Sequence, residues 1–298
     1  MIKRTLYFGN PAYLKTKNEQ LVIEVLGSGE TKTVPIEDIG IVILDHQQIT
    51  ITQAVMAKLL ENNAALITCN HTHHPVGLQL CLEGHTLQSR KFKDQVAASV
   101  PLKKQLWQQT VEAKILNQAK LLAIERLENK LLLNLAKNVR SGDAENCEAQ
   151  AANYYWKNIF PDFLHFKRFR EGEPPNNLLN YGYAILRAVV ARSLVASGLL
   201  PTLGIFHRNQ YNAYCLADDI MEPYRPFVDK VVCDIVRMNG KFLEMTPKMK
   251  QQLLTIPATD VLIGGQMSPL MNAVQRTTAT LAKCFEGSTK KILFPEFT

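Results

Sequence analysis

PLKKQLWQQTVEAKILNQAKLLAIERLENKLLLNLAKNV, residues 101–139, is where this sequence changes from strand patterns to helix patterns. Its apolar residues recur at three- and four-residue steps from Leu102 to Val139, which is typical of helices. One helix of this length would extend about 57 Å at 1.5 Å per residue, so we expect two helices with a break. Pro101 suits the first turn of the first of them. The stretch therefore predicts the start of a helical domain.

The residues before this stretch favour strands. Residues 39–44 form an almost continuous apolar run, which suits a buried strand. Thr52 is a good cap for one helix that runs to about residue 62. Other β-prone runs, broken by glycine, asparagine or proline, lie at residues 5–8, 20–25, 32–36 and 64–68. These patterns predict a small β-rich region with one helix.

The fold class that follows is α+β. We expect a small β-rich N-terminal domain at residues 1–82, a polar, basic linker at 83–100 and a larger all-α domain at 101–298. Beyond residue 139, helices are expected at about 144–159, 177–197, 210–221, 224–238, 246–254 and 267–286.

Composition excludes several classes of protein. No run approaches the roughly 18 apolar residues that a membrane-spanning helix needs, and the first ten residues, MIKRTLYFGN, lack the apolar core of a signal peptide. Six cysteines are scattered over 298 residues, which is typical of buried thiols in a reducing compartment. We expect a soluble, cytoplasmic protein without a membrane partner.

Positive charge is concentrated in residues 86–140. This segment holds eleven Lys/Arg against four acidic residues, an excess equal to the formal net charge of +7 of the whole chain. A focused basic excess is expected where a protein binds a phosphate backbone. An ordinary solvated helix face is the alternative, and charge alone does not choose between them.

A carboxylate stands in the middle of an apolar helix face. In the predicted helix after residue 141, which Ser141 or Asp143 is suited to cap, Ala152 and Ile159 fall within about 40° of Glu148 at 100° per residue. A buried carboxylate requires a cation close to it. An Arg or Lys side chain would form a structural ion pair, whereas a divalent metal would make Glu148 a ligand.

A second constellation lies downstream, where His207 follows an apolar Gly-Ile-Phe in a turn. Carboxylates crowd the end of the next predicted helix at Asp218, Asp219 and Glu222. They oppose the helix dipole and repel one another, so they too require a cation. Arg208 and Arg225 are candidate counter-ions, and a divalent metal is the functional alternative.

CNHTHHPVGLQLCLEGH, residues 69–85, has two cysteines and four histidines and suggests zinc. Its spacing matches no common finger pattern, and the segment is better explained as a turn that enters a short strand. We expect no zinc site there.

Several of these segments resemble one family, the CRISPR-associated adaptation integrases. NCEAQAANYYW (146–156) resembles the family's glutamate helix, LNYGYAILRAVVARSLVASGLLPTLGIFH (179–207) its stretch that ends in the active-site histidine, and LADDIMEPYRPFVD (216–229) its acidic motif. LWQQTVEAKILNQA (106–119) and IGIVILD (39–45) also fit, so that the resemblance covers nearly the whole chain. The motif variants look like the type II branch, which accompanies a large RNA-guided effector nuclease.

The resemblance implies a metal-dependent DNA endonuclease and integrase. Glu148, His207 and Glu222 would bind Mg²⁺ or Mn²⁺, with Asp219 as a fourth catalytic residue; either Asp219 or Glu222 can be the third ligand, and we favour Glu222. A spacer 3′-OH would attack a phosphodiester at the leader–repeat junction. The implied partners are protospacer and leader–repeat DNA, a second copy of the chain and the second CRISPR adaptation protein.

Within the basic segment, candidate phosphate-binding residues are Lys103, Lys104, Lys114 and Arg140. Four tyrosines are expected in the core, with stacking on DNA ends as the alternative: Tyr154, Tyr155, Tyr181 and Tyr183. Two other functions remain open. A DNA-binding scaffold without catalysis would need no metal, and a hydrolase of small phosphate compounds would leave the basic segment without a purpose.

Overall fold

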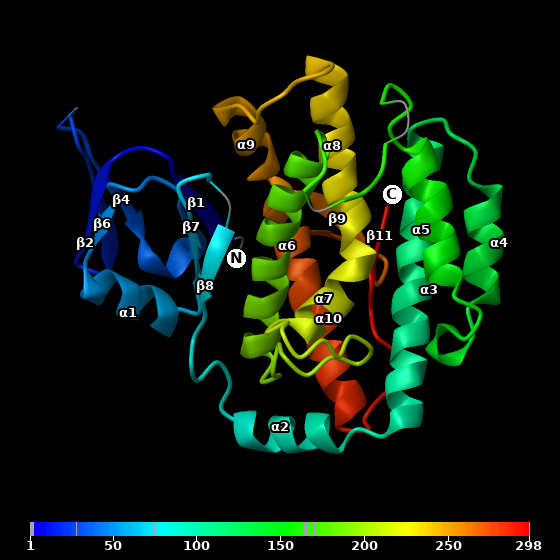
Figure 1. Cartoon of the computed structure of the whole chain (residues 1–298). Helices are drawn as coiled ribbons and strands as arrows, with labels where there is room; N and C mark the ends of the chain where they lie inside the picture. Colours follow the sequence, from blue (N-terminus) through cyan, green and yellow to red (C-terminus); the bar gives the residue numbers. More distant parts are fainter. Residues whose placement is uncertain (1–2, 28, 74, 164–165, 170, 298) are drawn as a thin grey trace.

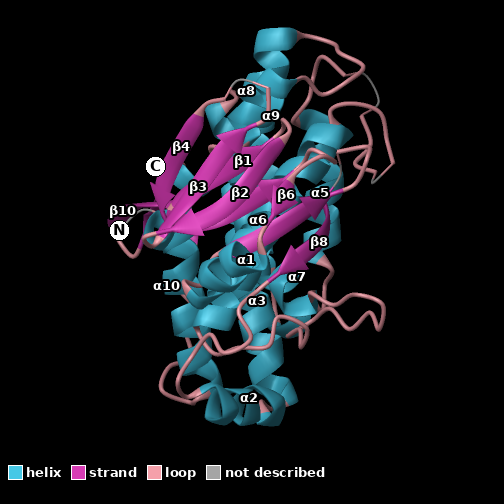
Figure 2. Cartoon of the chain, turned by 90° about the vertical axis from the view of Figure 1, so that its left-hand side faces the viewer, coloured by secondary structure: helices cyan, strands magenta, loops and turns pink. Residues whose placement is uncertain are grey.

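The computed structural model describes residues 3–27, 29–73, 75–163, 166–169 and 171–297. Strands gather in the N-terminal region, at the left of Figure 1, and helices make up most of the rest. The predicted α+β class is confirmed. Figure 2 looks onto the strands, with the helices behind them and α2 (Gln88–Ala97) at the lower end.

Two four-stranded sheets and helix α1 (Gln53–Glu61) form the N-terminal region. One sheet has the order β1 (Arg4–Phe8), β5 (Ile39–Leu44), β7 (Ala65–Cys69), β8 (Pro75–Gln79). The other has the order β4 (Thr31–Pro35), β3 (Gln20–Val25), β2 (Ala12–Lys17), β6 (Thr50–Ile51). A 3₁₀ turn at Ile36–Asp38 leads into β5. Thr52 accepts a hydrogen bond from the Val55 N–H, which confirms the predicted cap of α1.

Strand β5 is buried on both faces, as its apolar run predicts. It pairs in parallel with β1 and with β7, and such central parallel strands have no solvated face. Ile39 and Val42 belong to the core of the N-terminal region, whereas Ile41 and Ile43 pack with the helices. One sheet therefore contributes to two cores and joins the regions.

The helical region begins earlier than expected. Most of the segment expected as a linker, residues 83–100, is helix α2. Gln95 of this helix, 2% exposed, bonds the backbone of Leu200 and Leu203, so the segment is fastened to the helical region. The composition of residues 83–100 suggests a linker because most of the other side chains of this segment are polar and exposed to solvent.

Residues 101–139 form two helices with a break, as predicted. Ser99 caps α3 (Val100–Ile124), Pro101 lies in its first turn, and α4 (Lys130–Asn138) follows. The remaining helices are α5 (Cys147–Asn158), α6 (Asn176–Ala196), α7 (Cys215–Met221), α8 (Arg225–Asn239), α9 (Pro247–Leu253) and α10 (Leu270–Phe285). Short 3₁₀ turns lie at Ser141–Asp143, Glu222–Tyr224 and Ile256–Ala258.

The region is mostly helical and not entirely so. A small antiparallel sheet has the order β10 (Gln266–Pro269), β9 (Asp260–Ile263), β11 (Pro295–Glu296). The predicted helix at 267–286 therefore starts three residues later, because its first residues pair with β9. Buried helix α6 runs through the middle of this region (Figure 1).

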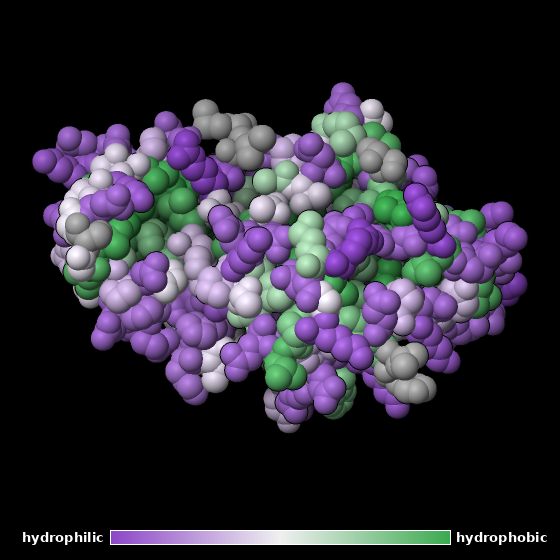
Figure 3. Space-filling view, turned by 90° about the horizontal axis from the view of Figure 1, so that it is seen from above, coloured by the Kyte–Doolittle hydropathy of each residue, from purple (hydrophilic) through white to green (hydrophobic). Residues whose placement is uncertain are grey.

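The surface is mostly hydrophilic, and the cysteines lie mostly inside. Figure 3 shows hydrophilic side chains over much of the upper face, with hydrophobic ones in patches between them. Within the described part of the chain, no helix is long and apolar enough to span a membrane. All six cysteines are free thiols, and five of them are buried.

Candidate active site

Helix α3 contributes two buried side chains to the candidate site. Trp107 and Lys114 lie two turns apart on it, and both are buried although one is charged. The ring of Trp107 stacks on Phe206 at 4.2 Å between centroids and meets His207 edge-on at 5.7 Å. The helix thus brings a lysine and the turn that carries His207 to one place.

Two predicted carboxylates converge on Lys114. Its Nζ donates to Glu148 Oε1 at 2.7 Å and lies 2.6 Å from Glu222 Oε2. Glu148 comes from the first turn of α5, where Asp143 accepts hydrogen bonds from the N–H groups of Cys147 and Glu148. Lys114 is therefore the cation that the apolar surroundings of Glu148 require.

Glu222 is held ionised by two cations. Arg225 Nε donates to its Oε1 at 2.8 Å, as expected of a counter-ion. Burial alone would raise the pKa of Glu222, but Arg225 and Lys114 outweigh it and hold the pKa at about 2. Burial would likewise lower the pKa of Lys114, and Glu222 and Glu148 reverse this and raise it. The ion pairs are therefore intact at neutral pH.

Asp219 fixes the turn that carries His207. Its carboxylate is fully buried and accepts the backbone N–H groups of Ile205 at 2.7 Å, Phe206 at 3.0 Å and His207 at 3.2 Å. Its Oδ1 also lies 2.5 Å from Nδ1 of His207, and this bond is the first cause of the raised pKa of the imidazole. With Nδ1 bonded to a carboxylate, Nε2 is the nitrogen left for a ligand.

A second aspartate anchors the far side of the same turn. Asp218 accepts two hydrogen bonds from Arg187, at 2.7 and 3.0 Å, and one from Asn212 Nδ2 at 2.7 Å. The pair Asp218–Asp219 thus ties residues 205–212 to helices α6 and α7. Sequence reasoning saw the acidic cluster but missed Arg187, since a lone arginine on a long helix gives no signal.

The candidate site contains side chains of the types that bind divalent metals, and the ammonium of a lysine lies between two of them. Within the described ranges, no three His, Cys, Asp or Glu side chains are grouped so that they could hold a metal ion as they stand. Yet Glu148 and Glu222 both point at one cation, Lys114, whose ammonium lies 2.7 Å from an oxygen of the first and 2.6 Å from an oxygen of the second. The charges of both glutamates also raise the pKa of His207. Two carboxylates and an imidazole suit Mg²⁺ or Mn²⁺.

The predicted phosphate-binding residues divide into two groups. Lys104 and Arg140 are exposed and Lys103 is half-buried, whereas Lys114 is 9% exposed and engaged by two glutamates. Lys114 therefore does not lie on the exposed basic surface, and its role as a phosphate-binding residue stays a prediction. Lys114 follows Trp107 by seven residues, and a helical wheel therefore places it on the buried face of α3, where a charged residue signals an ion pair.

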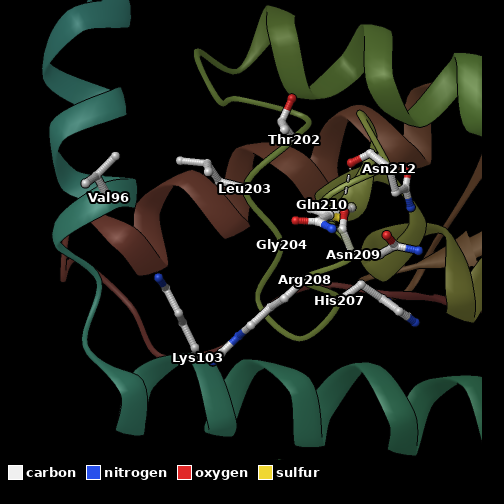
Figure 4. Close-up of a pocket in the computed structure, with 11 residues that line it drawn as sticks. Val96, Lys103, Thr202, Leu203, Gly204, His207, Arg208, Asn209, Gln210 and Asn212 are labelled. Atoms are coloured by element: carbon white, nitrogen blue, oxygen red, sulfur yellow. Dashed lines mark hydrogen bonds between the residues drawn. The ribbon is translucent and has the colours of Figure 1, made fainter.

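A cavity of about 410 Å³ lies beside His207. Figure 4 shows Arg208 reaching from the loop toward α3 beside Lys103, while His207 points the opposite way. Two cations, Lys103 and Arg208, thus line the cavity together with His207. Arg208, considered from sequence only as a counter-ion, belongs to this cavity.

Three of the four tyrosines lie in the core, as expected. Tyr155 and Tyr183 donate to the buried carboxylate of Asp229 at 2.8 and 2.5 Å, and Tyr181 is 2% exposed. Tyr154 is partly exposed and donates to the Glu128 carbonyl at 3.1 Å.

The histidine-rich segment at residues 69–85 includes strand β8, in agreement with the expected short strand. His73 Nδ1 lies 2.9 Å from Asp45 Oδ1. His74 lies outside the described residues. The contact between His73 and Asp45 joins the loop that follows β7 to the residue that follows β5.

Fold and site define an α+β protein in which a β-rich region packs on helices that hold two glutamates on one lysine and a histidine on a buried aspartate. The chain belongs to the Cas1 family: the family model "CRISPR associated protein Cas1" matches residues 6–252. It is 38% identical to the CRISPR-associated endonuclease Cas1 of Neisseria meningitidis serogroup C (strain 8013), over 99% of this chain and 97% of that protein.

Solved structures share the fold. A casposase bound to integration product superimposes with a TM-score of 0.79 at 18% identity, covering 98% of this chain and 92% of that one. A chain of a Cas6-RT-Cas1–Cas2 complex gives 0.75 at 20% identity, covering 97% of this chain and 35% of that one.

Proposed function

We propose that this chain is a divalent-metal-dependent DNA endonuclease and integrase that inserts new spacers into a CRISPR array. The observation that carries the proposal is the convergence of Glu148 and Glu222 on one cation position, together with the aspartate-held His207, whose pKa the charges of both glutamates raise. Two comparisons support the proposal. The Neisseria relative is named an endonuclease, and the casposase structure contains an integration product.

Glu148, Glu222 and Nε2 of His207 would hold the metal. When bound, Mg²⁺ or Mn²⁺ polarises a phosphate oxygen and stabilises the charge that develops on the phosphorus centre. The contact with Asp219 would hold the proton on Nδ1 and orient the ring, so that Nε2 would present its lone pair. Arg225 holds Glu222 ionised and in place.

The reaction exchanges one phosphodiester for another. The spacer 3′-oxygen forms a bond to phosphorus, the bond from phosphorus to the 3′-oxygen of the target strand breaks, and the proton lost by the attacking hydroxyl is balanced by one gained at the leaving oxygen. With water as nucleophile, the same site cleaves DNA. Lys103, Lys104, Arg140 and Arg208 would hold backbone phosphates around the site.

Partners follow from the family. We infer that the protein forms a homodimer and assembles with the second CRISPR adaptation protein, in keeping with the Cas1–Cas2 assembly of one structural relative. Protospacer and leader–repeat DNA are the proposed substrates. The type II-like assignment stays a prediction.

The test compares the wild type with Glu148→Ala on supercoiled DNA, with Mn²⁺ and with a chelator. We expect nicking and strand joining only by the wild type with metal, and DNA binding by both proteins. Metal-independent binding without nicking by the wild type would favour the DNA-binding scaffold.

A further inference from the structure

Lys114 occupies the position that the proposed metal needs. Its ammonium lies 2.7 Å from Glu148 Oε1 and 2.6 Å from Glu222 Oε2, and its side chain is 11% exposed. A divalent cation held by these carboxylates would need the same two oxygens. Two cations cannot share such a position, because their repulsion is strong where water is excluded. Metal binding therefore requires Lys114 to move.

The displaced ammonium would need another anion. A buried charge without a partner is costly. Arg225, which stays bonded to Glu222, also repels the ammonium of Lys114. A DNA phosphate at the site is an anion that the proposed reaction itself brings. The ammonium is suited to it, since lysine binds phosphate as a compact point charge.

We propose that Lys114 couples metal binding to DNA binding in this site. Without DNA, it neutralises Glu148 and Glu222 and competes with the metal. With DNA, its ammonium transfers to a phosphate and frees both carboxylates for the metal. The site therefore assembles only on its substrate, which limits metal-dependent cleavage elsewhere. This inference rests on the proposed function.

The experiment measures Mn²⁺ affinity by electron paramagnetic resonance of free Mn²⁺, with and without a short DNA duplex that ends in a 3′-hydroxyl. The proteins are the wild type, Lys114→Met and the control Lys120→Met, whose exposed lysine lies on the same helix. Lys114→Gln, which keeps hydrogen-bonding groups without the charge, serves if the methionine variant does not fold.

In the wild type, we expect DNA to raise Mn²⁺ affinity by about 10-fold or more, as typical couplings between two ligands do. Loss of the Lys114 charge should tighten Mn²⁺ binding without DNA by about 10-fold and shrink the DNA effect by about 5-fold, whereas Lys120→Met should match the wild type.

Unchanged Mn²⁺ affinity in the Lys114 variants, or an undiminished DNA effect, would overturn the inference and leave the metal-dependent function standing. Absence of Mn²⁺ binding by all three proteins, with and without DNA, would overturn both.

Discussion

The carboxylate of Asp219 organises the turn that presents His207: it accepts three consecutive backbone N–H groups and lies 2.5 Å from Nδ1 of the imidazole. It comes from α7, whereas Glu222 lies one turn later, beside Lys114. The two acids of one motif thus face different partners. This separation supports Glu222 as the metal ligand and Asp219 as the residue that orients His207.

The first prediction ranks these two acids. Glu222→Gln should reduce Mn²⁺-supported DNA joining about as severely as His207→Ala, because each removes a ligand. Asp219→Asn should cost about 10–100-fold, as losses of groups that orient a ligand do. Joining rates at saturating Mn²⁺ measure both, and the reverse ranking would assign the ligand to Asp219.

The second prediction concerns the basic surface. Replacing Lys103 and Lys104 by Gln should weaken duplex binding and lower the log–log salt slope by about 0.9 for each phosphate that the variant no longer binds. Fluorescence anisotropy over a salt series measures the slope. Lys17 and Lys32, exposed on the N-terminal sheet, give a matched control pair. Equal slopes for wild type and the Lys103/Lys104 variant would show that this surface does not bind DNA.

The third prediction is a pH dependence of stability that originates at Asp229. Burial raises its pKa to about 6, although Tyr183 and Tyr155 donate to it. The folded state thus retains a proton that the unfolded state loses near pH 4. The stabilisation from this group is complete below that pH and is lost as the pH rises through 6.

Asp229→Asn removes this dependence. Urea unfolding at pH 5 and pH 7.5 should show that the wild type loses, relative to the variant, about 1–2 kcal/mol of unfolding free energy on going to the higher pH. A constant difference between the proteins would mean that Asp229 has an ordinary pKa.

The fourth prediction concerns the joint between the two regions. Lys250 of α9 donates to Asp45, which follows β5, at 2.9 Å, and both side chains are buried. Lys250→Met leaves a buried carboxylate without its ammonium partner, beside Tyr7, His73 and Cys69, and should cost about 3 kcal/mol. Thermal unfolding measures the loss, with exposed Lys248→Met as control. Equal stability of the two variants would rule out a role for this ion pair in holding the regions together.

Periodic patterns could be predicted from the sequence, and three-dimensional pairings could not. The apolar run of β5, the break after Ile124 and the position of Glu148 on an apolar face all follow from local rules. A two-residue turn, Gly264–Gly265, joins β9 to β10, and this hairpin was missed because both strands have only four residues; β11 escaped because it lies far from β9 in the sequence. The same holds for Lys114, whose partners lie 34 and 108 positions further along the chain.

The central claim is that Glu148, His207 and Glu222 form one site that joins a DNA 3′-hydroxyl to a target strand. The most direct measurement is of covalent joining of a labelled duplex to a supercoiled target in the presence of Mn²⁺. The wild type and His207→Ala are each incubated with a duplex that ends in a 3′-hydroxyl and with one that ends in a 3′-deoxy sugar. The proposal predicts a covalent product only for the wild type with the 3′-hydroxyl end. Joining by His207→Ala, or by the wild type with the 3′-deoxy end, would contradict it.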